Sequence, residues 1–528
     1  MRDHEPIVIE EFNGLWKRGD AESCPLDHFS DCENIQFIYS GFETRDGVDV
    51  LYVGPNSDQL IANVARIYTY VRYDNEQRLL VLDTLGNIYD AGQLNPTNPI
   101  LTIPEMTDFA FVSVGGRAYI SPHNGVTGLP DEFLYVYLGD GNLARKAAGK
   151  GPVGNTGFTA VSSATTGKVE QGYHIFAVVY ETDTGFLTRL GPIEDSVDYD
   201  DPEVEKDNFF AELNVTVDDK KVSLSGIPVS PNAFVKFRHI VATKAIDPTF
   251  YDKNREGYQF FFIPEGKIEN NTDTTFEVDF FDQDLLDDAS HLLDLFSEIP
   301  AFVGLNTYHG RLVGVAEYGA PSQIVEDDES SLASTARVSY PGEPEAIDQV
   351  SGLIIAPLDG NELTNAQEFR DVLYLFKKTR TYAYSDNGDD PSSWPLTIID
   401  QGIGASVHGI ATVLDSGGVN IEYLIIIDYS GVMTFNGVFQ RPELSWKIRD
   451  FWFDLDRSAF KVIQCINDSV NQIFYCTLTN YRLLVGDYKN AFDPEKIRWA
   501  IWRFDFQVDT ITIFNTETLV LGSRAPLI

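Results

Sequence analysis

The sequence predicts an all-β protein: a β-propeller of about six to eight blades, interrupted by a β-sandwich of immunoglobulin or fibronectin type III character. The 528 residues include 35 Phe, 25 Tyr, 41 Gly and 25 Pro, a composition typical of many strands joined by many turns. Only three Met are present, and windows rich in Ala, Leu, Glu and Lys are few, which disfavours an all-α fold. A strand–turn–strand unit recurs about every 40–50 residues, and the pattern of the strands changes in the middle of the chain.

The recurring unit is clearest in residues 420–452. Residues 423–428 (YLIIID) are apolar and β-branched, as in a buried strand. A Ser-Gly turn leads to a second strand at 432–435, and Asn436-Gly437 predicts a tight turn because both residues tolerate positive φ. The apolar spacing in 444–452 predicts a short amphipathic helix or a closing strand. A single hairpin cannot bury both of its faces, so the unit needs copies of itself as neighbours.

Further copies of this unit divide the chain into four parts. Residues 1–55 form an aromatic lead-in with ring-closing strands, and residues 56–150 hold the first part of the propeller. The glycine-rich stretch 149–157 (GKGPVGNTG) predicts a boundary. The inserted β-sandwich domain then covers residues 151–300, and residues 301–528 complete the propeller with C-terminal closing strands.

The insert differs from the flanking units by its longer strands, in which every second residue is apolar and lies on the same face of the strand. One face of the strand at 172–180 (GYHIFAVVY) would carry Tyr173, Ile175, Ala177 and Val179. This spacing favours a sandwich of immunoglobulin or fibronectin type III character. Residues 198–207 predict a charged loop, and residues 280–296 predict a short amphipathic helix that leads out of the insert.

Two strands near the end of the chain, within residues 510–522, need partners. The N-terminal strands between residues 37 and 53 could supply them. We therefore expect the two ends of the chain to pair and to close the ring.

The chain carries a large excess of negative charge: 39 Lys and Arg stand against 80 Asp and Glu, a net charge of −41. Such a surface repels phosphates, which excludes a protein that grips DNA. Two interpretations stay open, namely solubility or a saline habitat, and a surface that DNA passes without sticking. Residues 1–10 lack an apolar segment and no stretch approaches 18 consecutive apolar residues, so we expect neither a secretory signal nor a membrane anchor.

The four cysteines show no metal-binding pattern. They are Cys24, Cys32, Cys465 and Cys476, and no CxxC pair is among them. Cys465 and Cys476 could face each other across a hairpin, and we expect free buried thiols.

Other candidate sites are better explained by turn chemistry. Residues 385–388 (SDNG), followed by Trp394, resemble the Asp-box hairpin of sialidase propellers, but the spacing to the Trp is too long. The acidic stretches 327–329 and 386–390 do not fit the EF-hand pattern, so solvated loops are expected. The eight histidines are scattered along the chain. Three of them are predicted to lie at the surface or at the edge of the core and not to bind a metal ion: His28, His239 and His309. The sequence therefore predicts no catalytic, cofactor-binding or metal-binding residue and no enzyme activity.

The order of several motifs resembles one family, the β-propeller structural proteins of tailed phages. The motifs are FNGLWKRG, CENIQF, GFETRDGV, RVSYPGEPE, LYLFKKTRTYAYSDNGDDPSSW, YLIIIDYSGVMTFNG, IRDFW and WAIWRFD. Among these proteins the chain is similar to the tail hub, nozzle and head-completion proteins of short-tailed phages. The resemblance covers most of the chain outside 151–300, and the insert is similar to fibronectin-like inserts of those proteins.

The resemblance implies a structural protein of the virion tail, a head–tail connector made in the host cytoplasm. It would assemble as a ring homo-oligomer, a hexamer, that extends the portal channel. Its partners would be portal or adaptor proteins above and tail tip, needle or fibre proteins below, and packaged DNA would be retained and then pass without specific binding. The family carries no catalytic residues or cofactors. The alternative is a propeller of the host-recognition apparatus that binds or degrades host glycans.

Overall fold

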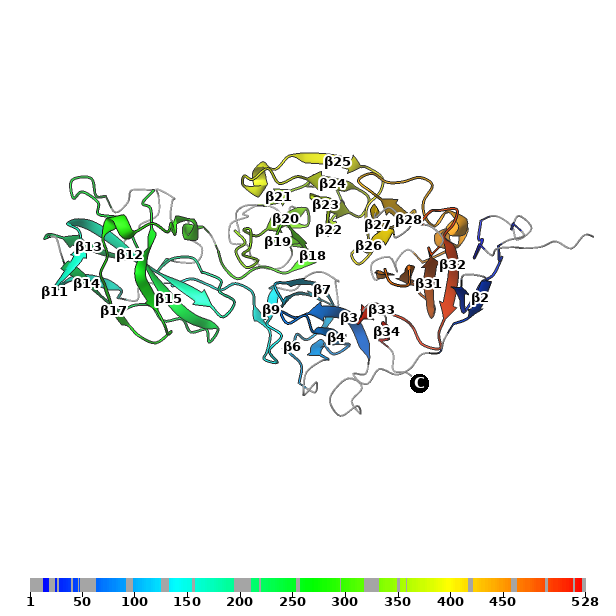
Figure 1. Ribbon diagram of the computed structural model, residues 1–528, viewed down its shortest axis with the longest axis horizontal. Helices are drawn as coiled ribbons and strands as arrows, with labels where there is room; N and C mark the ends of the chain where they lie inside the picture. The colour runs from blue at the N-terminus through cyan, green and yellow to red at the C-terminus, as the bar shows by residue number, and fades with distance from the viewer. Residues whose placement is uncertain are drawn as a thin grey trace, which may run out of the picture.

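The computed structural model describes residues 13–524 with internal gaps. The gaps are 19–23, 26–27, 39–40, 46, 48–62, 92–97, 125–132, 154–156, 194–209, 218–219, 253–256, 295, 318–331, 349–351, 358, 416–420, 457–462, 490–491 and 516–517. The chain forms two lobes, a β-propeller and a smaller β-sandwich (Figure 1). The predicted all-β propeller fold is confirmed.

Within the described residues, seven antiparallel sheets surround one axis. Blade 1 comprises β3 (Val64–Val71), β4 (Gln77–Asp83), β5 (Asn87–Asp90) and β6 (Leu101–Thr102). Blade 2 comprises β7 (Met106–Val114), β8 (Arg117–Asn124), β9 (Tyr135–Tyr137) and β10 (Arg145–Lys146). Blade 3 comprises β18 (Phe302–Tyr308), β19 (Arg311–Glu317), β20 (Thr335–Val338) and β21 (Leu353–Ile354). Blade 4 comprises β22 (Leu363–Phe369), β23 (Val372–Lys377), β24 (Thr381–Tyr384) and β25 (Leu396–Asp400), with the 3₁₀ turn η4 (Pro391–Ser393) before β25.

Blades 5 to 7 complete the ring. Blade 5 comprises β26 (Ile410–Asp415), β27 (Ile421–Asp428) and β28 (Gly431–Phe435), followed by η5 (Trp446–Ile448) and the helix α2 (Arg449–Phe453). Blade 6 comprises β29 (Cys465–Asp468), β30 (Ile473–Thr477), β31 (Arg482–Asp487) and β32 (Arg498–Arg503). Blade 7 is the hairpin of β33 (Thr510–Phe514) and β34 (Thr518–Gly522), and β33 lies between β29 and β3.

The turns of the blades follow from the residues that end the strands. Asp428 ends β27, and its carboxylate accepts the backbone N–H of Ser430 at 2.8 Å, which folds the chain into β28. Asp83 does the same after β4, where its Oδ1 accepts from the N–H groups of Leu85 and Asn87. An Asp side chain that accepts from a backbone two residues on is the usual start of such a turn. Of the two alternatives for residues 444–452, the helix is confirmed.

The insert is a sandwich of two sheets. One sheet has the order β11 (Thr159–Val169), β14 (Lys220–Ser225), β17 (Thr275–Val278). The other has the order β13 (Ala211–Val215), β12 (Gly172–Thr182), β15 (Val235–Ala242), β16 (Phe261–Ile268). Phe176 and Val178 of β12 pack with Val222 and Leu224 of β14 in the core between the sheets.

The alternation of residues 172–180 is as expected, with Ile175, Ala177 and Val179 on one face, but the expectation that only one face of this strand is apolar is wrong. The face with Ile175, Ala177 and Val179 is also buried, in a cluster that includes Ala110 and Tyr119 of blade 2. The reason is the junction with the propeller, which covers the second face of this central strand.

The expected helix over residues 280–296 is also wrong, because its backbone is used by a neighbouring strand. Among the described residues of this stretch, the helical elements are two 3₁₀ turns, η2 (Asp282–Asp284) and η3 (Ser290–Leu293). Between them, Ala289 donates its N–H to Phe260 O at 2.8 Å and Asp287 O accepts from Phe262 N at 2.9 Å.

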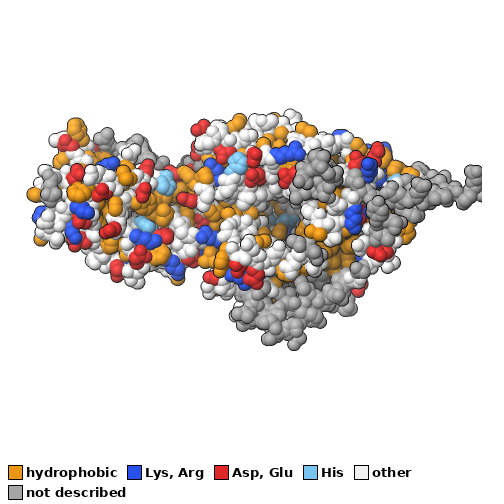
Figure 2. Space-filling model, in the orientation of Figure 1, with side chains coloured by type: hydrophobic (Ala, Val, Ile, Leu, Met, Phe, Trp, Pro, Cys, Tyr) orange, Lys and Arg blue, Asp and Glu red, His pale blue; other side chains and the backbone are white. Residues whose placement is uncertain are grey.

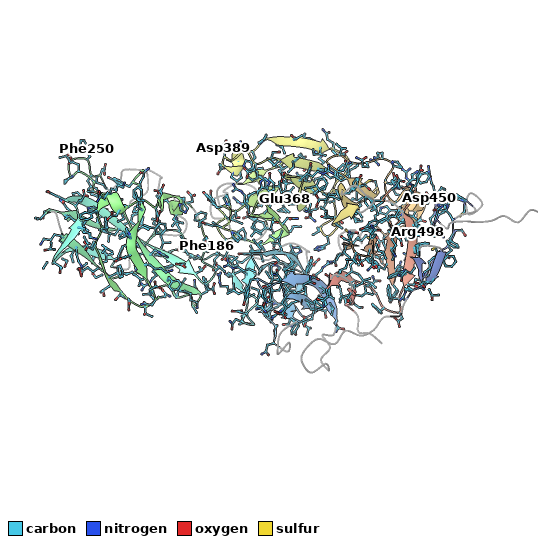
Figure 3. All side chains as sticks on the ribbon, in the orientation of Figure 1. Phe186, Phe250, Glu368, Asp389, Asp450 and Arg498 are labelled. Atoms are coloured by element: carbon cyan, nitrogen blue, oxygen red, sulfur yellow. The ribbon has the colours of Figure 1, made fainter. Side chains whose placement is uncertain are left out.

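The junction between the lobes contains charged groups as well as apolar ones. Arg145 at the outer edge of blade 2 binds Asp183 of the insert at 2.6 Å and Glu345 of blade 3 at 3.3 Å. Phe296, at the end of the insert, packs edge-on against Phe186 and against Tyr340 of blade 3, with ring centroids 6.3 and 5.7 Å apart. Figure 3 labels Phe186 at the junction of the two lobes. The insert is therefore anchored to blades 2 and 3.

The described strands of the N-terminal segment do not pair with β33 and β34, which corrects part of the ring-closing prediction. β1 (Ile35–Ile38) and β2 (Gly41–Thr44) pair with each other and lie beside β32 of blade 6. Trp502 of β32 donates its indole N–H to Ile35 O at 2.8 Å, which holds β1 there. The other predicted partner, residues 50–53, lies outside the described residues.

Candidate functional site at the propeller axis

Each of the seven inner strands carries a polar residue at varying positions, either within the strand or one to two residues before it. These residues are Arg66, Asp108, Asn306, Asn365, His408, Gln464 and Thr510, in or directly before β3, β7, β18, β22, β26, β29 and β33. The sequence analysis missed this set, because the positions of the polar residues differ from strand to strand and no fixed spacing marks them.

The strongest contacts at the axis are made by Asp108. Arg66 binds it with two parallel hydrogen bonds, from Nε to Oδ1 at 2.7 Å and from Nη2 to Oδ2 at 2.6 Å. His408 Nε2 lies 2.9 Å from Oδ2, and the N–H of Phe109 donates to Oδ1 at 2.8 Å. Both carboxylate oxygens are thus fully occupied, as the burial of a charge requires.

The environment decides which of these groups carry charge. Burial alone would raise the pKa of Asp108, but the charge of Arg66 and the hydrogen bonds from Arg66 and His408 hold it well below its ordinary value. Burial lowers the pKa of His408, and the charge of Arg66 lowers it further. Asp108 is therefore an anion and His408 a neutral imidazole at pH 7.

A neutral His408 can satisfy both of its neighbours with one tautomer. Its Nε2–H donates to Asp108, and its Nδ1, 3.1 Å from Tyr68 Oη, accepts the hydroxyl proton. This order of acid, imidazole and hydroxyl resembles a catalytic triad. However, burial raises the pKa of Tyr68, and its hydroxyl can donate its single proton to the backbone oxygen of Phe109 at 3.1 Å instead of to His408. Tyr68 is therefore a poor nucleophile, and its hydroxyl instead links blades 1, 2 and 5 through polar contacts.

Gln464 extends the network to blades 6 and 7. Its Oε1 accepts from Arg66 Nη1 at 2.9 Å and from Thr510 Oγ1 at 2.8 Å. Thr510 in turn accepts the N–H of Ile67 in blade 1 at 3.0 Å. These contacts join the first and last blades of the ring through side chains as well as through packing.

A cavity of about 190 Å³ lies at the axis beside this network. Figure 2 shows the recess at the centre of the propeller. Its walls come from six inner strands or the residues before them: Tyr68, Ala110, Phe111, Val303, Gly304, Leu305, Asn306, Asn365, Gln367, Val407, His408, Ile410, Gln464 and Cys465.

The amide side chains of this cavity bind the protein itself. Asn306 Nδ2 donates to Ala366 O at 2.6 Å and Asn365 Nδ2 to Val407 O at 2.7 Å. The Oδ1 atom of each accepts the N–H of the following residue. Each amide therefore links its own blade to the next one, and the cavity wall is held together by satisfied polar groups.

The candidate site residues named from the sequence lie apart from this axis. Asp386 accepts the N–H of Gly388 at 2.7 Å and Asp390 that of Ser392 at 2.8 Å, so the stretch 386–390 is built on turn chemistry, as expected. Cys465 and Cys476 are directly opposite in β29 and β30 as buried free thiols, which confirms that expectation. The acidic stretch 327–329 and the loop 198–207 lie outside the described residues.

The three histidines considered as possible metal ligands have different surroundings. His28 packs edge-on against Trp16 at 5.2 Å, and His239 contacts Glu181 at 2.6 Å on the insert. His309 lies at the tip of blade 3, partly exposed and close to carboxylates. Within the described part of the chain, no helix is long and apolar enough to span a membrane.

No protein-family model matches the chain, and no curated protein matches its sequence. Among solved structures, the chain is similar to YCF48 from Cyanidioschyzon merolae, with 8% identity and a TM-score of 0.26 over 88% of this chain and 95% of that chain. It is also similar to Hsv2 from Kluyveromyces lactis, with 10% identity and a TM-score of 0.26 over 83% and 98% of the two chains. AztD from Citrobacter koseri is similar with 10% identity and a TM-score of 0.24 over 66% and 89%. The fold assignment rests on the strand order of this chain.

Proposed function

We propose that the protein is a structural component of a phage tail, a hub or nozzle ring that extends the portal channel and conducts DNA at ejection. The observation that carries the proposal is a single hydrophobic cluster. Several motifs on which the resemblance rests are far apart in the sequence, yet they contribute residues to that one cluster in blades 5 and 6: Leu15, Cys32, Phe37, Ile427, Val432, Ile448, Trp452, Trp499 and Ile501.

Hydrogen bonds fix the N-terminal motif within this cluster. Leu15 donates its N–H to Trp499 O at 2.8 Å, and Lys17 donates to Lys447 O at 2.8 Å. Trp16 meets Trp446 edge-on, with centroids 5.4 Å apart, and the guanidinium of Arg18 lies 4.3 Å from the centroid of the Trp446 ring. The motifs therefore pack together as one structural unit. This supports the interpretation that their order in the sequence reflects membership of one family.

The axis of a single propeller is unsuited to conduct DNA, because Arg66, Asp108 and His408 bind one another across it. A conduit would therefore be the hole in a ring of copies, closed by repeated contacts between different surfaces of neighbouring copies. The net charge of −41 would keep phosphates away from its wall.

We further propose that the insert is a relative of immunoglobulin and fibronectin type III domains. The order β13-β12-β15-β16 corresponds to a C′-C-F-G sheet, and the neighbours β11 and β14 correspond to strands B and E. The last strand, β17, differs, since it follows the others in sequence and pairs with β14.

Mass photometry and electron microscopy of the purified full-length chain test the ring. We expect closed rings of about six copies of the 59.1 kDa chain. A chain that stays monomeric at about 10 µM protein, both alone and with phage portal protein, would contradict the proposal.

A propeller that binds host glycans is the second candidate, and the cavity of about 190 Å³ at the axis is the observation that favours it. Glycan hydrolysis there is disfavoured, because the depressed pKa of Asp108 prevents it from acting as a general acid. A glycan array decides between the candidates: binding that is lost in Gln367→Ala would support the second.

A further inference from the structure

We propose that the tips of blades 3 and 4 form a binding site for a divalent transition-metal ion, with Zn²⁺ as the best-fitting ion. The ligands would be His309, Glu368 and Asp371. His309 lies in the turn between β18 and β19, Glu368 near the end of β22, and Asp371 in the turn between β22 and β23. The site would therefore join two neighbouring blades; Figure 3 labels Glu368 on the propeller.

The donor atoms of these three side chains already converge. His309 Nε2 lies 3.9 Å from Glu368 Oε1 and 3.8 Å from Asp371 Oδ1, and one donor atom from each residue lies within 4.8 Å of the others. The donors of a tetrahedral zinc site are about 3.3–3.5 Å apart. Asp371 is 93% exposed, so its carboxylate can close the remaining distance without displacing other groups.

Neighbouring groups hold the other two ligands in place. The ring of His309 stacks on Tyr308 with centroids 4.2 Å apart, and Glu368 Oε2 accepts the backbone N–H of His309 at 3.3 Å. Asp386 Oδ2 lies 3.9 Å from His309 Nδ1, the nitrogen that faces away from the proposed ion. This distance is too long for a hydrogen bond, so Asp386 acts on the imidazole through its negative charge.

Two arginines near the site bind other groups, so the carboxylates of Glu368 and Asp371 stay available to a metal ion. Arg370 sits between them in sequence, but its guanidinium donates to Asn436 O and Glu422 O. Arg311 is held by Ser339 O and lies 3.6 Å from Asp386. Two carboxylates close together without a bound arginine favour a divalent cation.

The donor set selects among cations. One imidazole and two carboxylates suit Zn²⁺, whereas Ca²⁺ prefers an all-oxygen shell of six to eight ligands. Three protein ligands leave a fourth position for water, since His309 is 38% exposed and Asp371 is almost fully exposed.

Isothermal titration of the full-length, chelator-treated chain with ZnCl₂ tests the proposal. We expect one strong Zn²⁺ site per chain, and His309→Asn and Asp371→Asn should each weaken it at least tenfold. Asn tolerates the left-handed backbone at both positions, where φ is 47° and 61°. Asp386→Asn should weaken binding less than these two variants, because it removes a negative charge 3.9 Å from the imidazole but no ligand.

A matched control is His239→Asn, which removes another histidine that contacts a carboxylate and should leave Zn²⁺ affinity unchanged. CaCl₂ at the same concentrations should give no saturable heat. The proposal fails if the wild type binds no Zn²⁺ at 100 µM ion, in which case His309 makes ion pairs only. It also fails if His309→Asn and Asp371→Asn bind like the wild type.

Discussion

At the scale of single residues, the buried pair of Arg66 and Asp108 is the most consequential contact of the propeller. Asp108→Asn should destabilise the fold by about 3–5 kcal/mol, because it leaves a buried guanidinium without its counter-charge. Urea unfolding measures the change. The double variant Arg66→Met/Asp108→Leu should recover part of the loss, and a single variant within 1 kcal/mol of the wild type would show that the pair is not buried as described.

A second prediction at this scale concerns acid. Burial lowers the pKa of His123 to about 4, and its Nε2 lies 3.0 Å from Phe302 O in the neighbouring blade. The unfolded chain binds a proton near pH 6.5 but the native state does not, so the contribution of His123 is complete above pH 6.5 and is lost as the pH falls toward 4. The loss amounts to about 3 kcal/mol.

Unfolding free energies of the wild type and His123→Gln between pH 7.5 and 4 check this expectation. The variant should have a flatter profile, although His408, whose pKa is also lowered, continues to contribute a loss in the same direction. Parallel profiles for the two proteins would contradict it.

At the scale of elements, the hairpin of β33 and β34 completes the ring against β3. Thr510 Oγ1 accepts the N–H of Ile67, and Thr69 Oγ1 donates to Ile513 O at 2.6 Å. Deleting residues 509–528 should lower the thermal midpoint and the cooperativity of unfolding, because β3 and the axis network lose these partners. Calorimetry measures both quantities. A deletion variant with an unchanged midpoint would show that blade 7 is dispensable.

At the scale of the whole molecule, the excess of negative charge should be uneven if the protein is a DNA conduit. On the face shown in Figure 2, acidic and basic side chains are interspersed. The wall of an assembled ring should instead carry Asp and Glu with few Lys or Arg, because only charges within about 8–10 Å act on DNA at physiological salt. A virion structure decides: a neutral or basic lumen would reduce the charge to a solubility device.

The sequence by itself determined the strands, their turns and the repeating unit, because each depends on neighbours in the chain. Residues 423–437 show why: the apolar run, Asp428 and Gly431 specify strand, turn and strand whatever surrounds them. The same local information led to error at residues 280–296, where the apolar spacing suited a helix but Phe260 and Phe262 supplied extended partners.

Only the tertiary structure decided which polar residues meet at the axis. Arg66, Asp108 and His408 are separated by 42 and 300 residues, and no spacing rule joins them. Their meeting depends on the closure of seven blades around one axis, and the burial that shifts their pKa values exists only after that closure. The position of residues 35–44 beside β32, away from β33, depends in the same way on which apolar surface the assembled blade 6 leaves open. The sequence pattern predicts which face of a strand is apolar, but only the tertiary structure determines which residues pack against that face.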